Sequence, residues 1–153
     1  LNFIFEKIFI SCRVKVGNFP NWKGLLETLN SETVISVLPT HLKDCISEVV
    51  ALKGDAVLFE CETSTLKLSE ESAEKGRAES KITCEISGST DTKVALNAKQ
   101  LNEFVSSILR FSTVRNLTLR FPKDGTPVCL EYPTETGKIT YVQTQTRIEG
   151  FNS

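Results

Sequence analysis

Apolar positions follow two different periods along the chain, and each change of period marks a boundary between a strand and a helix. Residues 2–16 are apolar at roughly every second position, which is typical of extended chain. After a linker that contains Gly and Pro, the pattern predicts a strand over 33–38 and a helix over 40–52, with Thr40 as its N-cap. The apolar stripe of this helix consists of Leu42, Ile46, Val49 and Val50.

Strands are predicted after this helix as well. They cover 56–60, 65–68 and 78–86, and the polar residues 69–76 form a loop between the last two. The order of elements then begins again, with a strand over 93–96 and a helix over 98–110 that Asn97 can cap. The stripe of this second helix consists of Leu101, Val105, Ile108 and Leu109, and its strands cover 117–121, 128–132 and 139–148.

The two helical stripes coincide at an offset of 59 residues, from Leu42 to Leu101. We interpret this as an internal duplication of a β-α-β-β-β unit. Two unrelated amphipathic helices are the alternative interpretation, but the order and spacing of the elements also agree with duplication. We therefore predict an α+β fold in which two helices pack side by side on one face of antiparallel sheet and are related by a pseudo-twofold axis.

Composition excludes several classes of protein. Of the 153 residues, 40% are hydrophobic, and 18 basic against 19 acidic residues give a net charge of -1. Such a chain does not bind nucleic acid or membranes by bulk positive charge, although a local basic face is compatible with it. The sequence has no apolar run long enough to span a membrane, and its first ten residues lack a signal-peptide cleavage site. We expect a cytoplasmic protein.

Few residues suit catalysis or metal binding. His41 is the single histidine, and the five cysteines form no CxxC pair. We interpret the cysteines as reduced, buried thiols. An enzyme that uses a thiolate or His41 has no supporting spacing in the sequence, so we expect no enzymatic activity, no cofactor and no metal site.

Five short segments are more specific. In chain order they cover residues 19–22 (Phe-Pro-Asn-Trp), 66–79, 95–101, 126–128 and 141–148. On a duplicated unit of this kind they resemble the third domain of the bacterial DNA polymerase III β subunit, the sliding clamp, over about residues 8–148. The resemblance implies four parts: the end of a preceding domain and the start of a linker (1–18), the linker (19–30), the clamp domain (31–148) and a tail (149–153).

The resemblance also implies a function. A sliding clamp domain is one section of a ring that encircles duplex DNA as a processivity factor and tethers replication or repair proteins. The implied partners are duplex DNA, other clamp domains or subunits, and peptides of the polymerase and clamp loader. The expected DNA-facing residues, on or near the exposed helix faces, are Lys43, Lys53, Lys99, Arg110 and Arg115. The alternative is a clamp-fold module for protein interaction that no longer forms a ring around DNA.

A peptide groove is the last feature that the resemblance implies. Its expected lining comes from the interdomain segment and the C-terminal strand: Leu25, Leu26, Pro127, Val142, Thr144, Gln145, Thr146 and Arg147. Where the family has a Met-Pro-Met segment, this chain has Thr-Gln-Thr, and Glu27 stands near the place of an expected proline. Because Thr and Gln offer less adaptable apolar surface than Met, we expect a degenerate groove that binds weakly.

Overall fold

The computed structural model describes residues 2–5, 8–11, 21, 24, 26, 29, 31–52, 55–72, 75–111, 115–123 and 126–146. The helices are α2 (Pro39–Val49), which continues into the 3₁₀ turn η1 (Val50–Leu52), and α3 (Ala98–Ile108). The strands are β1 (Asn2–Phe5), β2 (Ile8–Ser11), β3 (Ser31–Val37), β4 (Ala56–Glu62), β5 (Thr65–Ser72), β6 (Gly76–Thr83), β7 (Glu85–Gly88), β8 (Lys93–Asn97), β9 (Leu117–Pro122), β10 (Val128–Pro133) and β11 (Lys138–Gln143).

The strands form three antiparallel sheets. β1 and β2 pair with each other, and the two larger sheets have the orders β11-β10-β9-β3-β7 and β6-β5-β4-β8. Each larger sheet combines strands from both halves of the chain, since β3 joins β9 to β11 and β8 joins β4 to β6. This exchange is the topology expected of a duplicated β-α-β-β-β unit with a pseudo-twofold axis.

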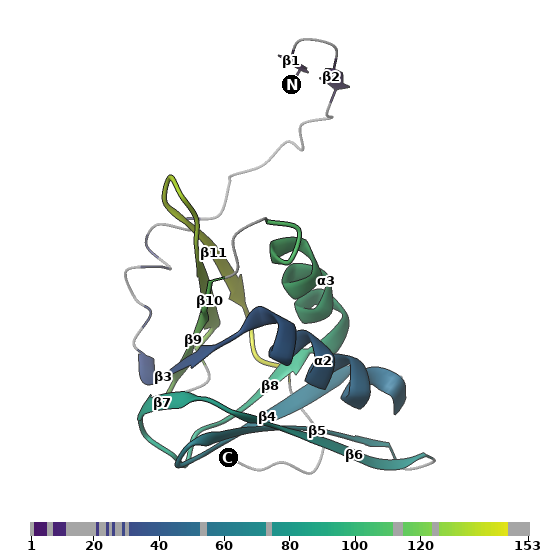
Figure 1. Ribbon diagram of the computed structural model, residues 1–153, viewed down its shortest axis with the longest axis vertical. Coiled ribbons are helices and arrows are strands. Elements are labelled where there is room, and N and C mark those ends of the chain that lie inside the picture. Colours follow the sequence, from purple (N-terminus) through teal and green to yellow (C-terminus); the bar gives the residue numbers. More distant parts are fainter. Residues whose placement is uncertain are drawn as a thin grey trace.

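The two helices lie side by side in the angle between the two larger sheets (Figure 1). The antiparallel sheet that the sequence predicts is thus divided in two, with both helices on the same side of it. The predicted stripes face the core. Their fully or almost fully buried members are Leu42, Ile46, Val49, Leu101, Val105 and Ile108.

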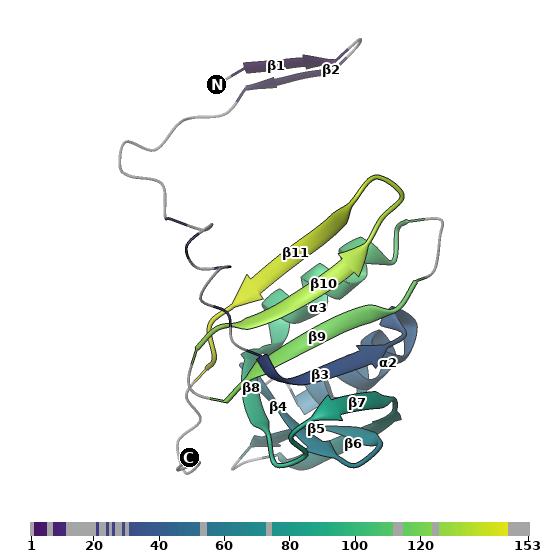
Figure 2. The ribbon, with the colours of Figure 1, turned by 90° about the vertical axis from the view of Figure 1, so that its left-hand side faces the viewer.

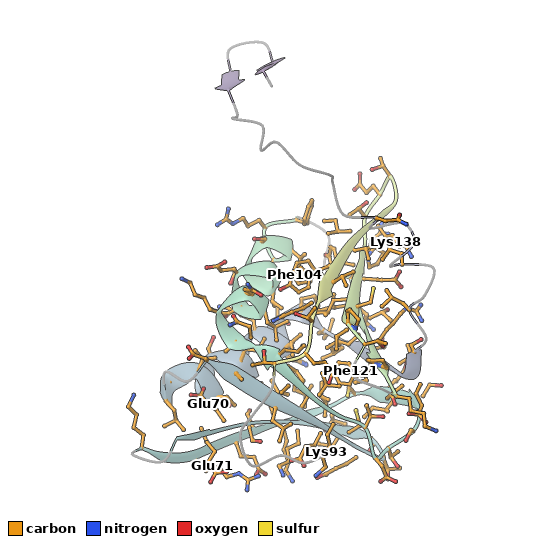
Figure 3. All side chains as sticks on the ribbon, turned by 180° about the vertical axis from the view of Figure 1, so that it is seen from behind. Glu70, Glu71, Lys93, Phe104, Phe121 and Lys138 are labelled. Atoms are coloured by element: carbon orange, nitrogen blue, oxygen red, sulfur yellow. The ribbon has the colours of Figure 1, made fainter. Side chains whose placement is uncertain are left out.

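The core lies between the two larger sheets and beneath the helices. Phe59 of β4 and Phe121 of β9 are fully buried, and their rings meet edge to face at 5.8 Å between centroids. Because β4 and β9 belong to different sheets, this contact joins the two sheets in the core, where Figure 3 labels Phe121. Burial of such aromatic side chains contributes about 1.5–3 kcal/mol each.

Two predictions at the level of secondary structure are wrong. α2 begins at Pro39 with Leu38 in the N-cap position and no side-chain cap, so Thr40 already lies inside the helix. Proline is suited to the first helical position because its fixed φ is helical and its missing N–H has no helical partner there. The predicted loop over 69–76 is largely strand, since β5 extends to Ser72 and pairs with β6 as far as Gly76.

The chain also crosses between the larger sheets at two places where a single strand is predicted. The strand predicted over 78–86 divides at Cys84, because β6 pairs with β5 whereas β7 pairs with β3. β7 ends at Gly88, which has a φ of 105° and lies so close to β3 that a Cβ atom would be 1.9 Å from the carbonyl oxygen of Glu32. Glycine is required at such a position.

The second crossing follows β11. The strand predicted over 139–148 ends at Gln143, and the backbone N–H of Thr146 then donates a hydrogen bond of 2.8 Å to the carbonyl oxygen of Ala95 in β8. Thr146 therefore lies beside β8 much as β7 lies beside β3, which extends the pseudo-symmetry to both crossings. Residues 147 and 148 lie outside the described part of the chain, as does most of the predicted extended chain over 2–16 beyond β1 and β2.

Candidate functional site: the two-helix face and the strand edges

The exposed sides of α2 and α3 form one polar surface, which we call the two-helix face. It consists of Lys43, Asp44, Ser47, Lys99, Asn102, Glu103 and Ser106. Asn97 caps α3 as the sequence predicts, because its Oδ1 accepts a hydrogen bond of 2.9 Å from the N–H of Gln100. Two lysines against two acidic residues make the face charge-balanced.

Hydrogen bonds on this face connect equivalent positions of the two halves. Nζ of Lys43 donates to Oδ1 of Asn102, and these residues are 59 apart, which is the offset between the helical stripes. Ser47 and Ser106, also 59 apart, each donate to the carbonyl oxygen four residues earlier, over 2.8 and 2.6 Å. The pseudo-twofold axis therefore passes between the helices at Lys43 and Asn102, and several polar groups of the face bond within the protein.

The predicted DNA-facing cations divide into two groups. Lys43 and Lys99 belong to the two-helix face, Lys43 half-buried at its centre and Lys99 exposed in the first turn of α3. Arg110 and Arg115 lie beyond the other end of α3, where Nη1 of Arg115 donates to the carbonyl oxygen of Thr134 over 3.4 Å. Lys53 lies outside the described residues. The structure thus does not gather these cations into one patch.

Predicted groove residues meet where β11 ends and the chain crosses to β8. Nε2 of Gln145 donates to the carbonyl oxygen of Thr126 over 2.9 Å, which holds the crossing beside Pro127. Val142 and Pro127 are half-buried, whereas Thr144 is exposed. Leu26 is half-buried, and Leu25 and Arg147 lie outside the described residues.

A buried glutamine stabilises this crossing. Gln143 is 5% exposed, its Oε1 accepts a hydrogen bond of 3.0 Å from Tyr141 Oη, and its Nε2 donates to the carbonyl oxygen of Asn97 over 3.4 Å. The crossing is therefore held by polar contacts to β8 and to the strand that precedes β10. Such a surface is less adaptable toward apolar peptide anchors than one made of methionines.

Sequence reasoning missed an apolar hollow between α3 and the β10–β11 hairpin, which we call the α3–β11 surface. A cavity of about 390 Å³ is lined by Phe104, Ser107, Ile108, Arg110, Phe111 and Ile139. A second cavity of about 260 Å³ adjoins it, lined by Phe111, Arg115, Tyr132, Pro133, Thr134, Glu135 and Thr136. Phe111, which borders both, is 48% exposed. A phenylalanine directly after the predicted helix end was the signal available in the sequence.

Ion pairs cover the outer face of the four-stranded sheet. Glu60 contacts Nζ of Lys67 at 2.8 Å and Nζ of Lys93 at 2.7 Å, and Glu79 contacts Lys67 and Arg77 at 3.5 and 3.2 Å. The hydrogen bonds from Lys67 and then Lys93 lower the pKa of Glu60 from 4.5 to about 2. These charges are paired with one another, so the network stabilises the sheet.

Thiol and metal chemistry find no support in the described part of the chain. Burial raises the pKa of Cys61 to about 12 and also raises the pKa of Cys45, Cys84 and Cys129, which disfavours the nucleophilic thiolate. These four thiols are unoxidised and buried or half-buried, as predicted, and Cys12 lies outside the described residues. Within the described ranges, no cluster of three or more His, Cys, Asp or Glu side chains could hold a metal ion, and no helix is long and apolar enough to cross a membrane.

Two similar half-domains that exchange strands beneath a pair of helices define the DNA-clamp class of fold. Within that class, the structure is similar to solved bacterial DNA polymerase III β subunits. It matches the β subunit of Thermotoga maritima with a TM-score of 0.78 and 20% identity, over 96% of this chain and 39% of that chain.

Two further solved clamps give similar agreement. The Bartonella birtlesii sliding clamp bound to griselimycin matches with a TM-score of 0.77 and 17% identity, over 96% of this chain and 38% of that chain. The Caulobacter crescentus sliding clamp matches with a TM-score of 0.74 and 17% identity, over 87% and 34%. The sequence matches no protein-family model and no curated protein.

These matches confirm the predicted fold. The chain has the sliding-clamp fold and spans 34–39% of the length of these three solved clamps. At identities of 20% and below, the similarity concerns the fold, and function has to be argued from the surfaces described above.

Proposed function

We propose that this chain is a sliding-clamp domain, one section of a ring that encircles duplex DNA with the two-helix face toward the DNA. The observation that supports this most directly is the two-helix face itself, which is symmetric, charge-balanced and hydrogen-bonded across the pseudo-twofold axis through Lys43 and Asn102. The clamp fold of the domain supports the same conclusion.

The chemistry of this face suits a protein that slides. A ring holds DNA by enclosing it, so it needs no tight phosphate contacts, and strong contacts would slow its movement along the duplex. Lys43 shares its ammonium group with Asn102, and Ser47 and Ser106 use their hydroxyl protons on the helix backbone. We expect the isolated chain to bind linear duplex DNA weakly, at about 10⁻⁴ M or worse at physiological salt.

In this proposal the domain is not an enzyme and serves as a tether. Peptides of replication or repair proteins would bind where Pro127, Val142 and Thr144 come together, with the low affinity expected of a groove built from Thr and Gln. The second candidate function, a clamp-fold interaction module without a ring, is favoured by this same polar groove.

Retention on circular DNA separates the two candidates. The chain is assembled at high concentration with nicked circular duplex, washed at raised salt, and the complex is then cut once by a restriction enzyme. A ring stays on the circle and leaves after linearisation, whereas an interaction module is retained on neither form. Equal retention before and after cutting would also contradict the proposal, because it indicates ordinary phosphate binding.

A further inference from the structure

The α3–β11 surface is open, whereas its counterpart in the other half of the domain is closed. On that other side, α2 packs directly on the edge strand β6, and Oγ of Ser80 in β6 donates a hydrogen bond of 2.6 Å to Glu48 of α2. On this side, the cavity of about 390 Å³ lies between the end of α3 and β11. Phe104 points from α3 toward β11, where it stacks on Tyr141 at 4.5 Å between ring centroids (Figure 3). The remaining space beside Ile139 and Phe111 is large enough for apolar side chains of another molecule.

Each larger sheet also ends in an open strand edge. β11 ends the five-stranded sheet and β6 ends the four-stranded sheet, and Figure 2 shows them at opposite ends of the domain. An open edge offers unpaired backbone groups that a strand from another chain can complete. The domain therefore carries one edge beside α3 and one beside α2, related by the pseudo-twofold axis.

The two edges differ in chemistry. β6 carries Arg77, Glu79 and Lys81, which engage in ion pairs along the outer side of the sheet. After Lys138, β11 has no charged residue, and its side chains Ile139 and Tyr141 face α3. An uncharged, apolar edge and a charged edge favour a contact between unlike edges over a contact between two like ones, because charges along an edge oppose pairing with a copy of that edge.

The turn at the end of α2 is suited to enter the cavity. In η1, Ala51 is exposed and Leu52 is half-buried, and η1 packs next to β5 and β6 at the charged edge. Leu52 and Phe111 are 59 residues apart, so the same position after each helix presents an apolar side chain. At one edge this position borders a cavity, and at the other it belongs to a small protruding turn.

We propose that the α3–β11 surface docks a second copy of this chain, which presents its α2–β6 edge and inserts η1 beside Phe111. Such a contact is heterologous, so each bound copy keeps one unused edge of each kind, and repetition either closes a ring or extends a filament. This inference rests on the proposed ring function and specifies the surfaces through which the sections join.

Mixing two variants of the full chain tests this directly. Phe111→Asp places a carboxylate in the cavity, and Ala51→Asp places one on the inserting turn. Both positions are exposed, so folding should be retained, and circular dichroism checks this. The matched control is Val34→Asp, which adds the same charge at a half-buried position on the outer face of β3, away from both open edges. Sedimentation velocity measures the mass over a concentration series.

The expected results are specific to a head-to-tail contact. The unsubstituted chain and Val34→Asp associate as concentration rises, each edge variant alone remains a monomer, and the equimolar mixture of the two edge variants forms a one-to-one dimer and nothing larger. A monomeric unsubstituted chain at all concentrations would overturn the inference and would leave the surface to a different partner. Self-association of Ala51→Asp alone would overturn it as well, since it indicates a contact between like edges.

The outcome is separable from that of the circular-DNA experiment. If retention on circles fails but the mixture gives the one-to-one dimer, the docking surface stands and the ring function falls. If the chain is retained on circles and Phe111→Asp does not alter this, the docking inference falls while the ring function stands.

Discussion

Thr33 and Thr92 hydrogen-bond to each other through their hydroxyl groups over 2.7 Å, and they are 59 residues apart. Both side chains are buried, at 0% and 7% exposure, and Oγ1 of Thr33 also lies 2.8 Å from the carbonyl oxygen of Ser89, to which it can donate. Direct contact between equivalent positions of two repeats occurs only where the repeats meet at their symmetry axis. Together with Lys43 and Asn102, this pair marks the pseudo-twofold axis through the domain.

Removing one of these hydroxyls should leave its buried partner poorly satisfied. We expect Thr33→Val to lower the free energy of unfolding by about 1–3 kcal/mol. The double variant Thr33→Val, Thr92→Val should cost less than the two single changes together, because it removes both members of the bond. Urea denaturation measures this, with the exposed Thr83→Val as a control that should change stability by less than about 0.5 kcal/mol. Additive single effects would show that the two hydroxyls act independently.

The pair Glu60 and Lys67 should make stability depend on pH in acid. The pKa of Glu60 is about 2 in the folded protein against 4.5 as its ordinary value, so its carboxylate stabilises the fold above pH 4.5, and this contribution is lost as the pH falls toward 2. We expect Glu60→Gln to lower stability at pH 7 by about 1 kcal/mol, after allowance for solvent screening, and to flatten the loss between pH 4.5 and 2. Thermal unfolding across this range measures it.

The control for this change lies on the same strand. Glu62 is 52% exposed on its side chain and 4.0 Å from Lys81, so Glu62→Gln should leave the acid slope almost unchanged. An equal effect of both substitutions would show that the bonds of Glu60 to Lys67 and Lys93 have no special role.

Truncation of a stripe residue should be costly in either half. Leu101 of α3 and Ile46 of α2 are fully buried, and we expect Leu101→Ala or Ile46→Ala to destabilise the fold by about 2–5 kcal/mol each. Lys99→Ala, at an exposed position of the same helix, should change stability by less than about 0.5 kcal/mol. A small effect in one half only would mean that this half is not needed to close the core.

The groove should bind clamp-recognition peptides poorly. A Gln-Leu-x-Leu-Phe peptide buries apolar anchors worth about 1.5–3 kcal/mol each, and loss of one anchor weakens affinity about tenfold or more. With Thr144 and Gln145 in place of apolar residues, we expect weak binding or none in a calorimetric titration. Low-micromolar binding that Thr144→Glu abolishes, while Thr118→Glu on the outer face of β9 does not, would show that the groove is functional.

Local patterns in the sequence were sufficient for the helices and for their symmetry. The stripes that contain Leu42 and Leu101 predicted both helices and the offset between them, and Asn97 acts as a cap because that bond needs only the next turn of chain. Thr40 failed as a cap because Pro39 takes the first helical position. Ser69 and Glu70 have the polarity of a loop, yet both are buried in β5 through its pairing with β6.

Features that depend on tertiary contacts were beyond the sequence. Alternation continues smoothly through Cys84 and past Gln143, so no local signal shows that the chain changes sheet there. The same limit applies to the site. The composition of the helix faces predicted a charge-balanced surface, but the bond between Lys43 and Asn102 and the cavity at Phe111 arise only when separate elements meet.

The central claim is that the two-helix face, and not a sheet, faces DNA, and photo-crosslinking to circular duplex tests it most directly. Benzoylphenylalanine is placed at Ser106 on the two-helix face in one variant and at Thr118 on the outer face of β9 in another. The account predicts that irradiation links Ser106-substituted chain to the duplex and leaves Thr118-substituted chain unlinked. Equal or greater crosslinking from position 118 would contradict it.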